Sequence, residues 1–292
     1  MIEVKNVTKT IHKTEVLNDV QFNVRPGTIT GVVGRNGAGK TTLLRMISGI
    51  IKPDQGDISV EGENVFQQPR VKQDIVFVPD STDALKTYTV KEIVKFYKVV
   101  YPNFDEEYYY SLLDQFKFNK SGKIKKLSKG QKALFSLILA FSTNAKFILL
   151  DEPTDGLDVI IKKEILQFIA EQVAHKDVSI IISSHRLDEL EKMADHIVVL
   201  KDGSVDSEVE METLKEQYKK VQVAYQGEFP QDIIQNLEVL SQNGRVGIVL
   251  LESDDEDGEA ILQNYAPILY EELPLSLEDI FVAKLGGDLY VS

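Results

Sequence analysis

The sequence has 292 residues, of which 43% are hydrophobic and 27% are charged, and it contains no cysteine. This balance is typical of a globular chain with room for one large and one smaller domain, and the lack of cysteine excludes disulfides and thiolate metal sites. The formal net charge of −13 disfavours nucleic acid as a partner. No stretch approaches the ~20 apolar residues of a membrane helix, so work at a membrane would need another chain to cross it.

The first two thirds of the sequence alternate short strand patterns with helical ones. Residues 2–4 and 22–24 are predicted as short alternating strands. Three unbroken apolar runs follow, at 29–33, 147–150 and 178–182. Runs of this kind are typical of parallel strands that are covered on both faces, and helical stretches separate them. The pattern therefore predicts an α/β fold with a largely parallel sheet.

Between about Leu85 and Ser142 the pattern becomes helical. Thr89 and Glu92 have the spacing of a capping box at the start of one helix. Residues 106–116 and 131–141 also show apolar residues at helical spacing. We therefore predict a helical subdomain, about 85–142, inserted into the α/β core.

The end of the sequence predicts a second, smaller domain. Residues 201–204 have the composition of a tight turn that would close a first domain at 1–205. A small accessory α+β domain at 206–292 is then predicted, with a charged helix at 208–219, strands at 221–225, 246–251 and 268–271, and a last helix at 276–285 capped by Ser276.

Residues 34–41 fit the pattern G-x-x-x-x-G-K-[ST] of a phosphate-binding loop, between a predicted strand and a predicted helix. Glycine lets backbone N–H groups converge on phosphate oxygens, and the helix N-terminus adds its positive end. Lys40 would reach the β- and γ-phosphates, Thr41 would bind Mg²⁺ and Thr42 would add a hydroxyl. The residues expected to bind nucleotide here are Gly34, Asn36, Gly37, Ala38, Gly39, Lys40, Thr41 and Thr42.

Two acidic residues follow the buried strand at 147–150, at the strand end where open α/β sheets bind ligands. Asp151 would hold Mg²⁺ directly or through water, and Glu152 would act as general base on the attacking water. Two such acids can also simply mark an exposed strand end. Their combination with the phosphate loop favours the catalytic interpretation.

Two further segments are weaker candidates by themselves. Ser128 could cap the helix that follows it, and with Gly130 and Gln131 it forms a second potential anion-binding end, although a plain helix cap is the simpler interpretation. His185 follows a third predicted parallel strand, where it could sense the γ-phosphate. A single histidine is more often structural, so this role depends on the strand order.

The order of these segments resembles that of the ATP-binding cassette (ABC) family over residues 1–205. The matching motifs are the phosphate loop, a signature-like segment at 127–131, the acidic strand and His185, together with 153–158. The resemblance implies the P-loop NTPase cassette fold, with ATP and Mg²⁺ as cofactors. It also implies a head-to-tail dimer, in which ATP lies between one chain's phosphate loop and the other's Ser128–Gln131, with Asp158 at the interface.

Three positions depart from the family pattern. Ile11 stands where an aromatic residue usually stacks on adenine, which implies weaker base stacking. Lys129 replaces a common glycine of the signature segment, which puts full hydrolytic competence in question. Asp80 replaces a common glutamine. It could still offer an oxygen to water or Mg²⁺, but from a charged carboxylate rather than from a neutral amide.

The region after residue 205 resembles ATPase subunits of bacterial exporters of the antibiotic-resistance, Ytr-type and phenol-soluble-modulin groups. The resemblance implies an ATPase on the cytoplasmic face of the cell membrane, in a homo- or heterodimer bound to a membrane permease. A soluble, non-transport ATPase of the same family is the alternative, which the single cassette and the acidic charge disfavour. A third possibility, a nucleotide-gated module that has lost hydrolysis, conflicts with the presence of Glu152.

Overall fold

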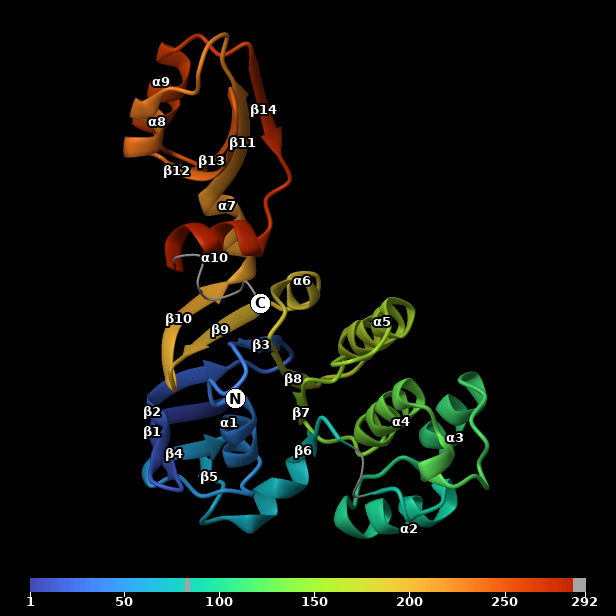
Figure 1. Cartoon of the computed structure of the whole chain (residues 1–292). Coiled ribbons are helices and arrows are strands. Elements are labelled where there is room, and N and C mark those ends of the chain that lie inside the picture. The colour runs from blue at the N-terminus through green and yellow to red at the C-terminus, as the bar shows by residue number, and fades with distance from the viewer. Residues whose placement is uncertain (82–84, 286–292) are drawn as a thin grey trace. The chain divides into compact units, whose positions relative to one another are not determined.

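The computed structural model describes residues 1–81 and 85–285, and these form two compact units. The core unit comprises residues 1–185 and 193–208, and the accessory unit comprises residues 186–192 and 209–292. Figure 1 shows the elements of both units in chain order. The short segment 186–192 thus belongs to the accessory unit, although core residues flank it on both sides.

The centre of the core unit is a six-stranded sheet in which the neighbours β6–β7, β7–β8, β8–β3 and β3–β9 are parallel. Every residue of β3, β7 and β8 is buried, which confirms the prediction of covered parallel strands. The strand order is β10 (Ser204–Glu210), β9 (His196–Lys201), β3 (Ile29–Val33), β8 (Ser179–Ser184), β7 (Phe147–Asp151) and β6 (Ile75–Val78).

A second, antiparallel sheet begins the chain. The short strands expected at 2–4 and 22–24 are the outer ends of much longer strands, β1 (Ile2–Ile11) and β2 (Thr14–Val24). Register shifts interrupt the β1–β2 pairing, and Asn6 within β1 has a positive φ of 49°. These irregularities break the alternation along the sequence, which is why the full length of the strands was not predicted. The sheet order is β2, β1, β4 (Gln55–Val60) and β5 (Glu63–Asn64).

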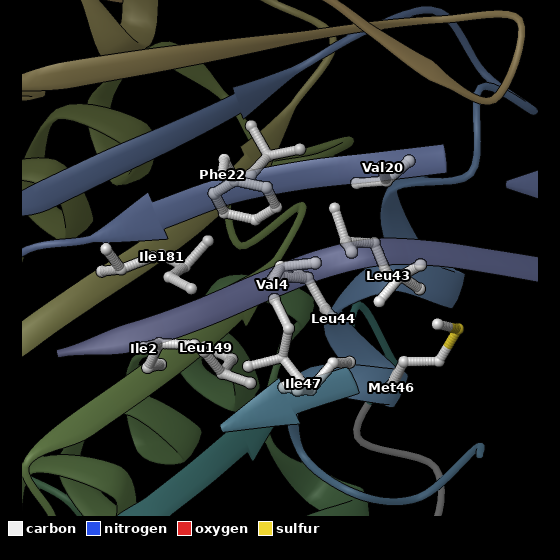
Figure 2. Close-up of a cluster of buried hydrophobic side chains, with 14 of the residues drawn as sticks. Ile2, Val4, Val20, Phe22, Leu43, Leu44, Met46, Ile47, Leu149 and Ile181 are labelled. Carbon is white, nitrogen blue, oxygen red and sulfur yellow. The ribbon is translucent and has the colours of Figure 1, made fainter. Parts of the chain in front are cut away.

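The hydrophobic core of this region lies between the two sheets and helix α1 (Lys40–Ile47). Figure 2 shows Ile2 and Val4 of β1 facing Leu44 and Ile47 of α1, with Leu149 of β7 beside them. The helix that follows the phosphate loop is therefore fixed by apolar packing along its length. This packing holds the loop against the carboxyl ends of the parallel strands.

The expected helical subdomain contains α2 (Val90–Val100), α3 (Glu106–Gln115) and α4 (Lys129–Phe141). Thr89 caps α2 in a capping box with Glu92, as predicted. Helix α4 contacts α3, β6 and α5 (Val159–His175), so its N-terminus has a fixed position beside the parallel sheet. Short 3₁₀ helices occur at Pro69–Asp74 and Ile124–Lys126.

The accessory unit has an antiparallel sheet in the order β12, β13, β11 and β14, with Val221, Val223 and Val249 in its hydrophobic core. Its elements are α6 (Leu187–Leu190), α7 (Met211–Gln217), β11 (Tyr218–Ala224), α8 (Gln231–Asn236), β12 (Glu238–Asn243), β13 (Val246–Glu252), α9 (Glu256–Asn264), β14 (Leu269–Leu273) and α10 (Leu277–Leu285).

Two expectations for this region were wrong in detail. The charged helix predicted at 208–219 is shorter, because β10 continues to Glu210 and β11 begins at Tyr218. Strand β12 was not predicted at all, because its second half is polar and exposed and lacks an apolar alternation.

The last helix and its cap are confirmed, since Ser276 Oγ accepts a hydrogen bond of 3.2 Å from the Asp279 N–H. Across residues 1–81 and 85–285, none of the helices combines the length and apolar character needed to span a membrane.

Candidate functional site

The phosphate loop depends on glycine at positions that a side chain would disturb. Gly37 and Gly39 have φ values of 88° and 102°, which L side chains rarely adopt. A Cβ on Gly34 would lie 2.5 Å from the carbonyl oxygen of Leu200, a backbone atom that cannot move aside easily. Gly39 precedes α1 and provides no side-chain cap. The first N–H groups of α1 therefore have no side-chain partner at their N-cap, which suits an anion.

Asp151 ends β7 with its side chain buried, 1% exposed. Its Oδ1 accepts hydrogen bonds from the hydroxyls of Thr41, at 3.0 Å, and Ser183, at 2.8 Å. Burial raises the pKa of this carboxyl, against the lowering effect of those two hydroxyls. Within the described residues, the buried Oδ2 has no hydrogen-bond partner. A buried carboxylate oxygen without a donor beside a threonine hydroxyl is chemically suited to a hard cation.

Glu152 contacts two other predicted site residues. Its Oε2 lies 2.9 Å from Nδ1 of His185, and its Oε1 lies 3.0 Å from Nζ of Lys40. Its backbone N–H donates to the hydroxyl of Ser183 on the neighbouring strand β8. Glu152 also has a positive φ of 46°, a conformation that costs a non-glycine residue on the order of 1–3 kcal/mol and is concentrated at functional sites.

Lys40, Glu152 and His185 line one cavity of about 320 Å³ at the carboxyl ends of the parallel strands, and Asp151 lies outside this lining. Asp80 lies there too, and its charge contributes to the raised pKa of Asp151. The sequence interpretation missed two lining residues, Val16 and Asp155, and Ile11 lies outside this lining. The cavity is lined by Val16, Asn36, Gly37, Gly39, Lys40, Thr41, Thr42, Asp80, Glu152, Asp155 and His185.

The signature-like segment lies outside the lining of that cavity in the described part of the chain. Ser128 and Gln131 form a capping box, in which Ser128 Oγ accepts from the Gln131 N–H and Gln131 Oε1 accepts from the Ser128 N–H. A Cβ on Gly130 would lie 2.7 Å from the Ile161 side chain, so this glycine allows α4 to approach α5. Asp158 caps α5 through the N–H groups of Ile160 and Ile161.

A second cavity, of about 340 Å³, lies beside the first and is lined by Lys129, Asp80 and Glu152 among others. The Nζ of Lys129 lies close to Gly156, since a Cβ there would meet it at 2.3 Å. The lysine that replaces a family glycine is therefore placed over the loop at 153–158. Gly34 and Ala38, which were also expected to bind nucleotide, lie outside the lining of the first cavity.

Comparison with known proteins places this geometry in a family. Residues 17–155 match the family model described as "ABC transporter". The chain is 38% identical to the ABC transporter ATP-binding protein YtrB of Bacillus subtilis, over 98% of this chain and 99% of that protein. The chain belongs to the ABC transporter ATP-binding family. It is thus an ATP-binding, ATP-hydrolysing subunit of an ABC transporter, as its motifs predicted.

Other family members agree with this assignment. The bacitracin transport ATP-binding protein BcrA of Bacillus licheniformis is 27% identical over 98% of both chains, so the similarity includes the accessory unit. A solved ATP-binding subunit of an ABC transporter superposes with a TM-score of 0.66 and 28% identity, over 74% of this chain and 92% of that chain. An ABC cassette solved in its ADP conformation superposes with a TM-score of 0.64 and 25% identity, over 74% of this chain and 94% of that chain. The predicted P-loop cassette fold is confirmed.

Proposed function

We propose that this ABC subunit hydrolyses ATP through Lys40, Glu152 and His185, with Thr41, Asp151 and Asp80 at a Mg²⁺ site. The observation that supports this best is the convergence of all six residues at one edge of the parallel sheet, five of them in the lining of one cavity. The phosphates lie along the loop from Gly34 to Thr42, where N–H groups and the Lys40 ammonium face them.

The reaction transfers the γ-phosphoryl group of ATP to water. Glu152 accepts a proton from the attacking water, the water oxygen bonds to the γ-phosphorus, and the bond from that phosphorus to the β–γ bridging oxygen breaks. His185, 2.9 Å from the Glu152 carboxylate, keeps this base in a fixed orientation. The products are ADP and inorganic phosphate.

The residues around Asp151 fit a magnesium ion. Mg²⁺ in ATPases is held by one or two protein oxygens together with phosphate oxygens and water. Thr41 Oγ1 and Asp151 provide such oxygens, and Asp80 lines the same cavity. Among the described residues, groups of three or more His, Asp or Glu side chains that could bind a metal alone are absent. When bound, the ion neutralises charge that develops on the phosphates.

We further propose that two such chains close on ATP, with Ser128, Gly130 and Gln131 of one chain facing the phosphates held by the other. In support, these residues lie outside the lining of their own chain's cavity. Val159 and Ile160, next to Asp158, are 81% and 80% exposed, which is unusual for adjacent aliphatic residues and favours contact with another chain. Hydrolysis would then depend on dimer closure.

The subunit would act at the cytoplasmic face of a membrane, bound to a permease, and the transporter would be an exporter. The exposed apolar residues Phe96 and Val99 of α2 support a protein partner for the helical subdomain. The relative BcrA is named for bacitracin transport, and the region after residue 205 resembles exporter subunits, which supports the exporter assignment. The tyrosines at 108–110 are not proposed as a docking patch, because Tyr109 is fully buried.

Affinity purification of the tagged chain from detergent-solubilised membranes tests the transporter assignment. We expect an integral membrane protein in stoichiometric amount, and reconstitution of that complex should show ATP-dependent movement of cargo out of the cytoplasmic side. A chain that purifies with ribosomes or DNA-associated factors instead would contradict the transporter role and favour the non-transport ATPase.

A further inference from the structure

The segment that follows His185 belongs to the accessory unit. Residues 186–192 group with 209–292, while β8 before them and β9 after them are strands of the core sheet. Within this segment α6 buries both of its leucines, Leu187 and Leu190, the latter completely. A four-residue helix with no exposed apolar side chain depends on tertiary packing for its position.

That packing is provided by the last helix of the accessory unit. Helix α10 contacts α6, and it also contacts strands β12 and β13. Leu277, Ile280 and Phe281 of α10 are buried. The position of α6 therefore follows from the position of α10 on the accessory sheet.

A polar anchor fixes α10 on that sheet. Lys220 of β11 donates to both carboxylate oxygens of Asp279, at 2.9 and 2.8 Å. Asp279 Oδ2 also accepts hydrogen bonds from the Ser276 hydroxyl and backbone N–H, at the start of α10. Such charge-assisted bonds are stronger than neutral ones, and they join the helix to β11, one of the two inner strands of the accessory sheet.

One residue connects this assembly to the site. Arg186 donates from Nε and Nη2 to the two oxygens of Asp188, at 3.1 and 2.8 Å, and its Nε lies 3.2 Å from Oε1 of Glu189. Arg186 is thus held by α6 itself. Because consecutive Cα atoms are about 3.8 Å apart, the position of Arg186 limits where the backbone of His185 can lie.

We propose that the accessory unit positions His185 against Glu152 through α6 and Arg186, and thereby controls the rate of ATP hydrolysis. The inference rests on the proposed role of His185 in holding the catalytic base. Arg186, Asp188 and Leu190 are positioning residues, since His185 makes the contact with Glu152. A ligand or partner that shifts α10 changes the fraction of chains with this contact formed.

The test measures kcat and KM for Mg²⁺-ATP in the full chain. The variants are Leu190→Ala in α6 and Ile280→Ala in α10, with Ile233→Ala as matched control, because Ile233 is equally buried in α8 on another part of the same unit. We expect the first two to lower kcat by on the order of 5–20-fold with KM little changed, and the control to lose stability only. Equal kcat in Ile280→Ala and Ile233→Ala would overturn the proposal.

A surface variant covers the case in which a core variant fails to fold. Asp188→Asn removes the carboxylate that holds Arg186, and its matched control is Asp257→Asn on the exposed face of α9. Asp188→Asn should lower kcat several-fold in wild type but cause no further loss in a His185→Ala background. A loss of the same size in both backgrounds, or none in either, would overturn the proposal. If His185→Ala itself hydrolyses ATP at the wild-type rate, the proposed role of His185 fails instead.

Discussion

The hydroxyl of Thr41 donates a hydrogen bond of 3.0 Å to Oδ1 of Asp151. Thr41 lies in the first turn of α1, directly after the phosphate loop, and Asp151 is the last residue of β7. The contact joins the phosphate-binding and acidic motifs at one point, and this is where we propose the Mg²⁺ site.

Replacing Thr41 by valine should raise the Mg²⁺ concentration required for half-maximal ATP hydrolysis by about tenfold or more. The side chain keeps its shape while the metal loses one oxygen ligand. Titrating Mg²⁺ at saturating ATP measures the effect. Thr10→Val, an exposed position in β1, is the matched control and should behave as wild type. An unchanged Mg²⁺ requirement in Thr41→Val would remove Thr41 from the metal site.

Gly34→Ala should destabilise the chain by about 1–3 kcal/mol and weaken ATP binding, because its Cβ would overlap the Leu200 carbonyl. Thermal unfolding with and without ATP would measure both effects. Gly227→Ala makes a suitable control, since a Cβ there meets no atom within 4 Å and its φ is not positive. A wild-type melting temperature in Gly34→Ala would contradict the close approach of loop and strand.

The anchor of α10 should be sensitive to acid. Although burial alone would raise the pKa of Asp279, hydrogen bonds from Lys220 and Ser276 lower it below its ordinary value. An acid with a lowered folded-state pKa contributes stability that is present above its unfolded pKa and is lost as the pH falls through the folded pKa. Asp279→Asn should therefore cost about 1–3 kcal/mol at neutral pH.

Urea denaturation from pH 7 down to about pH 3 checks this dependence. The difference in unfolding free energy between wild type and Asp279→Asn should shrink below about pH 4, while Asp257→Asn should differ little from wild type throughout. A difference that stays constant over the whole range would show that the Asp279 carboxylate is not stabilised by its partners in the folded chain.

Val99 of α2, 83% exposed, should matter for partner binding and not for catalysis. Val99→Glu should reduce recovery of the membrane partner at least severalfold, because a charge at an apolar contact must be buried without a partner. The ATPase rate of the isolated chain should not change. Val159→Glu serves as the comparison, and it should instead impair ATP-dependent dimerisation. Full recovery of the partner with Val99→Glu would exclude this face of α2 from the contact.

The sequence was most informative where a motif has a local geometry. The glycine-rich loop between a strand and a helix, the acidic strand end and the caps by Thr89 and Ser128 were predicted correctly, since each depends on residues within a few positions of one another. The convergence of Glu152 with His185 also followed, because parallel strands place their carboxyl ends at one edge.

The features that were missed depend on contacts between distant residues. Val16 reaches the cavity because β2 passes beside Gly39, where its carbonyl would lie 2.9 Å from an added Cβ. Strand β12 forms through pairing with β13 and not through its own apolar pattern. The grouping of residues 186–192 with the accessory unit arises from packing against α10, almost a hundred residues later in the chain.

The most direct test of the account replaces the proposed base, Glu152, by glutamine. Glu152→Gln should lower kcat by roughly 10²–10⁴-fold, retain ATP binding and accumulate an ATP-bound dimer on size-exclusion chromatography. Glu164→Gln, on the exposed face of α5, should hydrolyse ATP as wild type does. ATP hydrolysis at the wild-type rate in Glu152→Gln would contradict the central claim that this carboxylate activates the attacking water.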